Sequence, residues 1–315
     1  MDVSQISRIL VLGTGNMGPG IALQFARAEY DTVIWGRNEP SAMKGMQHLK
    51  DYLHDLLREE ILSEEEAEQI THRVTPSYDL KAACKNVDFA VEALSEDLKL
   101  KQQIFSQLDE FCAPETILAS STSTLYPSSI NEQMNLSERM LVAHFWNPAY
   151  LAPLVEVCGS RETSETTKEV TMKLLSKIGN EPVLMKKEIL GFIGNRLMHA
   201  MNREAISLVE KGVVSPDDID KVINTSFGPR FANLGLLEYL DASGLDLIKS
   251  IQGYLYGDLD TTGGVMSFIE QKVEEGELGA KSGNGFFEWS NRSLDDIRYK
   301  RDIEFVRRQK RQQKN

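Results

Sequence analysis

A glycine-rich segment near the amino terminus constrains the fold more than any other part of the sequence. The aliphatic run Ile9-Leu10-Val11-Leu12 leads directly into Gly13-Thr14-Gly15-Asn16-Met17-Gly18, and residues 21–28 then follow a helical pattern. In such a strand, turn and helix, the first glycine permits the tight turn, the second lets the backbone approach a pyrophosphate, and the third allows close helix packing. The helix amino terminus offers free N–H groups to phosphates. The segment therefore predicts a dinucleotide site that contains Gly13, Thr14, Gly15, Asn16, Met17 and Gly18.

Strand-like and helix-like segments alternate through the first 185 residues. Apolar runs at 32–35, 87–93, 116–120 and 182–185 predict further strands, and the spacing of apolar residues predicts helices at 42–71 (a pair), 98–112 and 165–178. This alternation predicts parallel βαβ units, in which ligands bind at the carboxyl ends of the strands. Glu92, Ser123 and His144 fall at or near such ends, although a serine in a Ser/Thr cluster is also typical of ordinary turn chemistry.

The pattern changes near residues 186–190. From Gly191 onward the spacing is helical, and no strand-like run returns before residues 285–289. The fold class we predict is α/β: a Rossmann-type dinucleotide-binding domain at 1–187 with a helical-pair insertion, followed by a smaller all-α domain for substrate binding and dimerisation at 188–315.

The residues after the second predicted strand favour NADP over NAD. An NAD enzyme usually places an acid here against the ribose 2′-hydroxyl, but this chain has Gly36-Arg37-Asn38. Because a guanidinium can pair with the 2′-phosphate, we expect Arg37 and Asn38 to lie at the cofactor. The alternative is an exposed loop arginine with NAD still bound.

Residues 141–157 place one histidine and one acid among apolar residues. Glu156, buried in a predicted strand, needs a cationic or hydrogen-bonding partner, and His144, twelve residues earlier, is the nearest suitable residue. Two strands joined by a short loop through Asn147-Pro148 can bring the pair together as a general acid/base dyad. The alternative is a core histidine and a rim carboxylate that never meet.

Composition excludes several classes of protein. The net charge of −12 argues against a general nucleic-acid binder, no apolar run reaches membrane-spanning length, and the amino terminus lacks signal-peptide features, so we expect a cytoplasmic protein. The three cysteines are far apart and form no CxxC pair, which indicates reduced thiols in or near the core. The segment 292–315 is locally basic, with nine Lys/Arg against four Asp/Glu. Its apolar spacing predicts a terminal helix docked on its own protein or on a sister subunit, with a phosphate-attracting tail as the alternative.

Several stretches together resemble the 3-hydroxyacyl-CoA dehydrogenase family. They are the glycine segment 13–18, Val91-Glu92-Ala93, residues 119–123, His144-Phe145-Trp146-Asn147-Pro148, Leu154-Val155-Glu156-Val157, residues 191–197, 217–220 and 281–286. The resemblance implies that His144 moves the proton of a 3-hydroxyl, that Glu156 orients and charge-balances it, and that Ser123 and Asn195 bind the reacting oxygen or its neighbour. It further implies that Glu92, Asn147 and Lys281 lie at the cofactor, that no metal is needed, and that the chain is a homodimer through its helical domain.

The sequence departs from the family pattern at three places. Ser121 replaces an asparagine, Leu190 replaces a proline, and residues 226–238 replace a methionine-proline run. Arg230 in the last of these can face a substrate carboxylate instead of a thioester. The first hypothesis is therefore an NADP- or NAD-dependent dehydrogenase of a short 3-hydroxyacyl-CoA. The second is a dehydrogenase of a free hydroxy acid, similar to carnitine or gulonate dehydrogenases, and the third is a non-catalytic protein of the lens-crystallin type.

Overall fold

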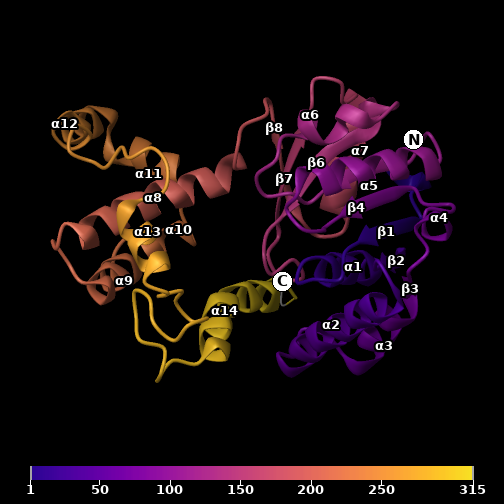
Figure 1. The fold of residues 1–315 in the computed structure, drawn as a ribbon, viewed down its shortest axis with the longest axis horizontal. Helices are drawn as coiled ribbons and strands as arrows, with labels where there is room; N and C mark the ends of the chain where they lie inside the picture. The colour runs from indigo at the N-terminus through magenta and orange to yellow at the C-terminus, as the bar shows by residue number, and fades with distance from the viewer. Residues whose placement is uncertain (1, 314–315) are drawn as a thin grey trace. The chain divides into compact units, whose positions relative to one another are not determined.

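The computed structural model describes residues 2–313, which form two units (Figure 1). The first unit extends to Ile193 and also includes the described residues from Tyr299 onward, and the second comprises Gly194–Arg298. The first contains one sheet with helices, and the second is helical. The predicted class, a Rossmann-type α/β domain followed by a smaller helical one, is confirmed.

The first unit is built on an eight-stranded sheet in the order β3-β2-β1-β4-β5-β6-β7-β8. The strands are β1 (Arg8–Leu12), β2 (Asp31–Trp35), β3 (Val74–Ser77), β4 (Phe89–Glu92), β5 (Ile117–Ser120), β6 (Met140–Phe145), β7 (Leu154–Gly159) and β8 (Glu181–Met185). Neighbouring strands from β3 to β6 are parallel, β7 runs antiparallel to β6, and β8 is parallel to β7. The carboxyl end of β6 therefore lies beside the start of β7. The predicted contact between His144 and Glu156 requires this arrangement.

Alternate residues of each strand pack into two separate apolar cores, one on each face of the sheet. The helices of this unit are α1 (Gly18–Arg27), α2 (Glu39–Arg58), α3 (Glu64–Arg73), α4 (Leu80–Ala83), α5 (Leu98–Phe111), α6 (Pro127–Ile130) and α7 (Glu165–Lys177). Side chains of α1, α2, α3 and α7 pack on one face, and those of α4, α5 and α6 on the other. Both faces are covered, as the continuous apolar character of the central strands requires.

The helical pair expected between residues 42 and 71 is present as α2 and α3, and the capping box of Ser63 and Glu66 opens α3. Strand β3 has no counterpart among the predicted strands. It is only four residues long and contains Pro76, which an edge strand tolerates, and it pairs with β2 alone. A short strand with a proline gives little sequence signal.

The first unit continues past the boundary that the sequence predicts near 186–190. Phe192 is 1% exposed and packs in the core with α5, and the Ile193 amide donates a hydrogen bond to Glu156 at 2.8 Å. The sequence predicts a boundary at 187 because helical spacing resumes soon afterwards. The first turn of that helix instead belongs to the core of the first unit.

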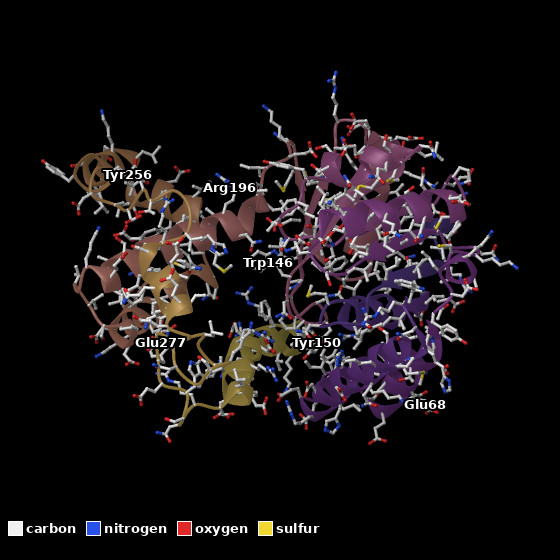
Figure 2. The ribbon with its side chains drawn as sticks, in the orientation of Figure 1. Glu68, Trp146, Tyr150, Arg196, Tyr256 and Glu277 are labelled. Atoms are coloured by element: carbon white, nitrogen blue, oxygen red, sulfur yellow. The ribbon has the colours of Figure 1, made fainter. Side chains whose placement is uncertain are left out.

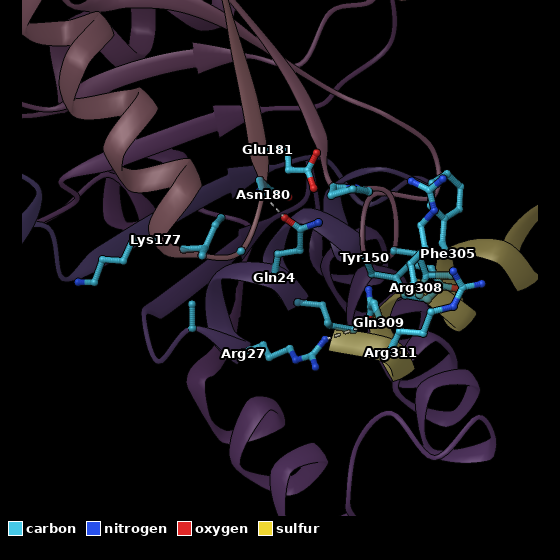
Figure 3. A pocket seen from close by; sticks show the side chains of 16 residues that line it. Gln24, Arg27, Tyr150, Lys177, Asn180, Glu181, Phe305, Arg308, Gln309 and Arg311 are labelled. Atoms are coloured by element: carbon cyan, nitrogen blue, oxygen red, sulfur yellow. Dashed lines mark hydrogen bonds between the residues drawn. The ribbon is translucent and has the colours of Figure 1, made fainter. Parts of the chain in front are cut away.

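The basic terminal segment forms helix α14 (Leu294–Gln313), and its residues from Tyr299 onward belong to the first unit. Val306 is buried in the same core as α1, Lys310 pairs with Glu59 at 3.6 Å, and Gln309 accepts from Arg27 at 3.4 Å (Figure 3). A terminal helix docked on its own protein is confirmed. A second domain at 188–315 would include this helix, because charge and spacing do not say which surface a helix covers.

The second unit contains most of α8 (Phe192–Glu210), together with α9 (Pro216–Thr225), α10 (Gly228–Phe231), α11 (Leu236–Ser243), α12 (Leu245–Leu255) and α13 (Ser267–Glu274). Figure 2 marks Arg196 and Tyr256 in this unit, and Trp146 and Tyr150 in the first. No helix within residues 2–313 combines the length and apolar character that crossing a membrane requires.

Candidate active site

Strands β6 and β7 place His144 directly opposite Glu156. The imidazole Nδ1 lies 2.9 Å from the carboxylate Oε2, and the two side chains are 7% and 1% exposed. The pair thus meets inside the protein, at the carboxyl end of β6, where an α/β sheet binds its ligands. The arrangement of a histidine and a rim carboxylate that never meet is therefore wrong.

Two further donors fix the Glu156 carboxylate. The indole Nε1 of Trp146 donates to Oε2 at 3.1 Å, and the Ile193 amide donates to Oε1 at 2.8 Å. Because both of these groups can only donate, the carboxylate is held as an acceptor, and Nδ1 of His144 is its natural third donor. The Nε2 atom then carries the lone pair that can accept a proton.

Aromatic rings hold the imidazole of His144 in place. The ring of Phe192 stacks on it with centroids 5.4 Å apart and planes at 26°, and Trp146 lies at 5.6 Å and 47°. Phe192 itself has φ of 51°, a left-handed conformation that bulky residues seldom adopt. The strained backbone thus belongs to the residue whose ring packs against His144.

The glycine segment between β1 and α1 fits the pyrophosphate of a dinucleotide. Gly13 has φ of +122°, and a Cβ there would lie 2.4 Å from the Ala93 carbonyl oxygen; a Cβ on Gly18 would lie 1.9 Å from the Gly13 carbonyl oxygen. Gly15, in contrast, has no atom within 4 Å of its Cβ position, so its backbone is accessible to a ligand. The first and third glycines thus build the turn, and the second leaves room for phosphate.

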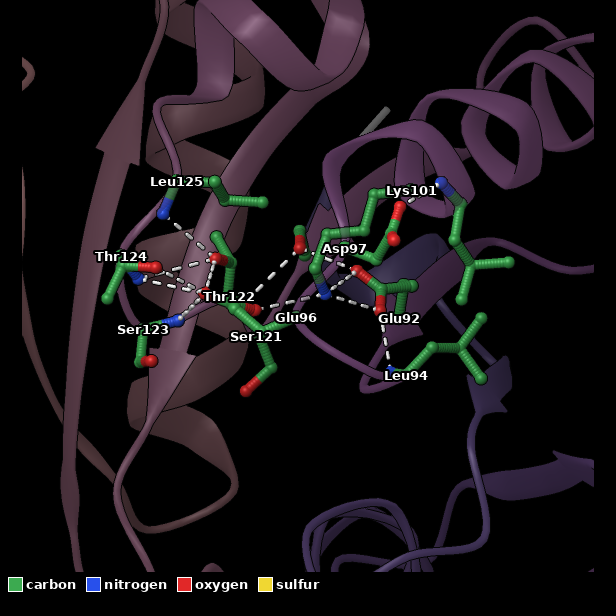
Figure 4. Close-up of polar contacts among 12 residues, drawn as sticks. Glu92, Leu94, Glu96, Asp97, Lys101, Ser121, Thr122, Ser123, Thr124 and Leu125 are labelled. Atoms are coloured by element: carbon green, nitrogen blue, oxygen red, sulfur yellow. Dashed lines mark hydrogen bonds and ion pairs between the residues drawn. The ribbon is translucent and has the colours of Figure 1, made fainter. Parts of the chain in front are cut away.

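A turn rich in hydroxyl groups follows β5 and carries Ser123 (Figure 4). Oε1 of Glu96 accepts from the Ser123 amide at 3.1 Å, from the Thr124 amide at 3.1 Å and hydroxyl at 2.7 Å, and from the Thr122 hydroxyl at 2.5 Å. Burial raises the pKa of the Glu96 carboxyl, but the hydroxyl donors of Thr122 and Thr124 and the charge of Lys101 outweigh this effect and hold it below its usual value. Glu96 therefore fixes the turn that presents Ser123.

Sequence reasoning missed Glu96. The available signal was its place four residues after the end of β4, among other acids, at the edge of the sheet where ligands bind. Glu92, the acid that the family resemblance places at the cofactor, is fully buried. It accepts from Lys101 at 2.7 and 3.0 Å, from Ser120 at 2.6 Å and from the Leu94 amide at 2.6 Å. Its contacts join β4, β5 and α5, and its contact with the cofactor stays a prediction.

Three residues predicted to contact the cofactor, Arg37, Asn38 and Asn147, lie in exposed loops. The Asn38 side chain accepts from the Ser41 amide at 2.9 Å and so caps α2, whereas Arg37 is exposed in the same loop. Asn147 is exposed two residues after β6, in a cis bond to Pro148. The roles of these three residues toward a cofactor stay predictions.

Asn195, Arg230 and Lys281 belong to the second unit. Asn195 lies near the start of α8, and Lys281 in the turn after Gly279. The Arg230 guanidinium lies over the Tyr239 ring at 5.5 Å and donates to its hydroxyl at 3.2 Å. The structure brings His144, Glu156, Trp146 and Phe192 together within the first unit, and the roles of the second-unit residues stay predictions.

Among the described residues no three His, Cys, Asp or Glu side chains form a metal-binding group.

Two family models match nearly the whole chain. The model of the 3-hydroxyacyl-CoA dehydrogenase NAD binding domain covers residues 8–189, and that of the C-terminal domain of the same family covers residues 191–289. The two matches meet at residue 190, close to the junction of the two structural units.

Individual relatives extend over most of the chain. It is 33% identical over 290 residues to a probable 3-hydroxybutyryl-CoA dehydrogenase of Bacillus subtilis, which covers 92% of this chain and 99% of the relative. It is 31% identical over 282 residues, 90% of each chain, to the 5-formyl-3-hydroxy-2-methylpyridine 4-carboxylate 5-dehydrogenase of Mesorhizobium japonicum. A solved structure of a 5-dehydrogenase acting on that carboxylic acid, described as an NAD+ dependent dismutase, superposes with a TM-score of 0.87 at 28% identity, covering 96% of both chains.

Proposed function

Since this chain belongs to the 3-hydroxyacyl-CoA dehydrogenase family of nicotinamide-dependent oxidoreductases, we propose that it transfers hydride between the cofactor and the 3-hydroxy group of a short-chain 3-hydroxyacyl-CoA. The observation that carries the proposal is the buried contact of 2.9 Å between His144 and Glu156. A histidine at the ligand-binding edge of the sheet, with its second nitrogen available, is suited to remove and return a hydroxyl proton.

The protein residues divide the proton chemistry between them. With Nδ1–H donating to Glu156, Nε2 of His144 accepts the proton of the 3-hydroxyl during oxidation and returns it during reduction. The imidazolium that forms is stabilised by the Glu156 carboxylate, which Trp146 and Ile193 keep in position. The nicotinamide cofactor, bound along the glycine segment 13–18, supplies the redox chemistry by accepting or giving hydride.

Ser123 and Asn195 are proposed to bind the oxygen that reacts or the neighbouring carbonyl. Such donors position the substrate and stabilise negative charge that develops on oxygen in the transition state. The bonds from residues 122–124 to Glu96 support this role for Ser123, because they fix the turn before substrate arrives.

We propose NADP as the preferred cofactor. The end of β2 provides Gly36-Arg37 where an acid would bind the ribose of NAD, and the Arg37 side chain is exposed. The NAD+ dependence of the similar solved structure supports the alternative. Arg37→Ala should lower kcat/KM for NADPH at least tenfold and leave the value for NADH within about twofold.

A free hydroxy acid is the second candidate substrate. It is favoured by the substrate named for the Mesorhizobium relative, a carboxylic acid without coenzyme A, and by the high TM-score of the related structure. Arg230, held by Tyr239 in a fixed orientation, is the proposed partner of the substrate carboxylate.

A homodimer through the second unit is also proposed. Among residues 194–298, all of which the structure describes, only Ser207 and Met266 are buried. Large apolar side chains are exposed throughout this unit, including Val213 (67%), Leu237 (74%), Leu245 (62%) and Tyr254 (89%). So much exposed apolar surface is typical of an interface. Light scattering should give twice the chain mass, and replacing Leu237 and Tyr254 by serine should reduce it.

The test of function is steady-state oxidation of NADPH and of NADH, each with acetoacetyl-CoA and with free acetoacetate. Turnover of the CoA ester alone supports the first proposal, and turnover of the free acid alone overturns it in favour of the second. His144→Gln should lower turnover by about 10²–10⁴-fold with cofactor binding retained. His72→Gln is the matched control, because His72 also lies near a glutamate, Glu68 at 3.6 Å, but both are exposed on α3.

A further inference from the structure

A cavity of about 740 Å³ lies in the first unit beside α14 (Figure 3). Its walls come from α1, from the loop before β7, from the turn between α7 and β8, and from α14. The volume falls within the range of about 300–1,000 Å³ that is typical of small-molecule sites. All of its lining residues belong to the first unit, so the cavity does not depend on the second.

The lining is strongly basic although the protein is acidic. It contains Arg27, Lys177, Arg308 and Arg311, and Glu181 is its one acidic residue among the described side chains. Glu304 on α14 offsets part of this charge, with its Oε1 at 3.6 Å from Arg308 and 3.5 Å from Arg311. An excess of positive charge remains, on a chain whose net charge is −12.

Arg27, the last residue of α1, has little compensation of its own. Its Nη1 donates to the neutral amide of Gln309 at 3.4 Å, and partial burial lowers the pKa of its guanidinium, with the charge of Glu66 acting in the opposite direction. An anion in the cavity would place a counter-charge beside this guanidinium, whose hydrogen-bond partner on α14 is neutral. Figure 3 shows Arg27, Arg308 and Arg311 around the end of α14.

The rest of the cavity is lined by paired amide groups and apolar surface. Asn180 donates to Oε1 of Gln24 at 2.8 Å, and the Gln24 amide group donates to the carbonyl of Ala149. Leu23, Ile178 and Phe305 supply apolar walls. A ligand that used all of these surfaces would carry several negative charges on one part and an apolar or aromatic group on another.

We propose that this cavity is a second ligand site, separate from the cofactor site, which binds a phosphorylated small molecule of the nucleoside diphosphate type. The proposed cofactor phosphates lie at the amino end of α1, whereas Arg27 is nine residues beyond its first residue, about 14 Å away at 1.5 Å per residue. Guanidinium groups recognise phosphate oxygens through paired hydrogen bonds. The cavity is lined by three guanidinium groups, which is more than a ligand with a single carboxylate would need. Bound there, the ligand bridges α1 and α14.

The test is calorimetric titration of the full chain saturated with its nicotinamide cofactor, using inorganic diphosphate and ADP as probes. Saturation keeps ADP from the glycine segment. Both probes should bind, ADP at least fivefold more tightly than diphosphate, and both should raise the melting temperature. Arg308→Ala and Arg27→Ala should each weaken ADP binding at least fivefold and leave turnover unchanged.

Lys310→Ala is the matched control, because Lys310 is a cation on the same helix that pairs with Glu59 and does not line the cavity. Absence of binding to the saturated enzyme would overturn the proposal. So would an equal loss of binding in Lys310→Ala, which would indicate a general charge effect, and equal affinity for the two probes would overturn the nucleotide assignment. Since the readout is binding, failure here is distinct from failure of the proposed reaction.

Discussion

Nδ1 of His144 lies 2.9 Å from Oε2 of Glu156, and the register of β6 and β7 sets the two residues opposite one another. With the Glu156 side chain 1% exposed, water does little to screen the interaction between the charges. The carboxylate is therefore placed to stabilise a protonated imidazole as well as to orient a neutral one.

Glu156→Gln should lower kcat by about 10²–10³-fold and change KM for the cofactor less than threefold, because glutamine keeps an acceptor but loses the negative charge. Steady-state kinetics across pH checks this. Glu165→Gln is the control, since Glu165 also has a cationic partner, Lys168 at 2.8 Å, but is 79% exposed. Wild-type turnover in Glu156→Gln would contradict the proposed role.

Alanine substitutions should separate the two uses of glycine in the segment 13–18. Gly18→Ala should prevent or strongly impair folding, because its Cβ would lie 1.9 Å from the Gly13 carbonyl oxygen. Gly15→Ala should fold with a melting temperature near that of the wild type, because its Cβ meets nothing within 4 Å, and should weaken cofactor binding by at least tenfold. Circular dichroism and cofactor titration provide the two readouts. A folded Gly18→Ala variant that binds cofactor normally would refute the packing argument.

Glu96→Gln should destabilise the protein at neutral pH and have less effect in acid. The pKa of Glu96 is lowered in the folded state, so its carboxylate contributes stability above the pKa of the unfolded chain, and this contribution is lost as pH falls through the lower folded pKa. Urea unfolding at pH 7 and pH 4 should therefore give a difference between variant and wild type that shrinks at pH 4. Glu115→Gln, at an exposed position, should show no such trend. A constant difference at both values would exclude the charge of Glu96 as its cause.

The three cysteines should react slowly with a thiol reagent while the protein is folded. Cys84, Cys112 and Cys158 are all buried, and burial together with the charge of Glu188 raises the pKa of Cys158 to about 11. Burial restricts access to all three thiols, and because the thiolate is the reactive form, the raised pKa opposes the reaction further at Cys158. Ellman's reagent should titrate three thiols promptly in denaturant and fewer than one in the native protein over the same time. Rapid labelling of the native protein would contradict this prediction and would indicate that the apolar core containing the three cysteines opens readily.

Local patterns in the sequence predicted the parts of the site that depend on local structure. The glycine spacing located the turn between β1 and α1, and an acid inside an apolar strand indicated that Glu156 needs a partner near in sequence. The same reasoning placed the reduced thiols in the core. In each case one strand or turn determines the geometry.

Contacts between distant segments were not predictable in this way. Ile193 donates to Glu156 from 37 residues away, and Glu96 binds a turn 26 to 28 residues later. The local sequence distinguishes Glu92 in a strand from Glu96 in a loop, but it does not show which hydroxyl groups each carboxylate binds, because that depends on the strands and turns around it. The surface covered by α14 likewise depends on the tertiary fold and not on its charge pattern.

Because residues 299–313 pack on the first unit, that unit is incomplete while residues 194–298 are being synthesised. At about 5–20 residues per second, the ribosome takes on the order of ten seconds to add the helical segment. During this interval the sheet and α1 can fold, but the apolar surface that Val306 later covers stays exposed to water and to chaperones. The first unit of the nascent chain therefore stays incompletely packed until α14 leaves the exit tunnel of the ribosome.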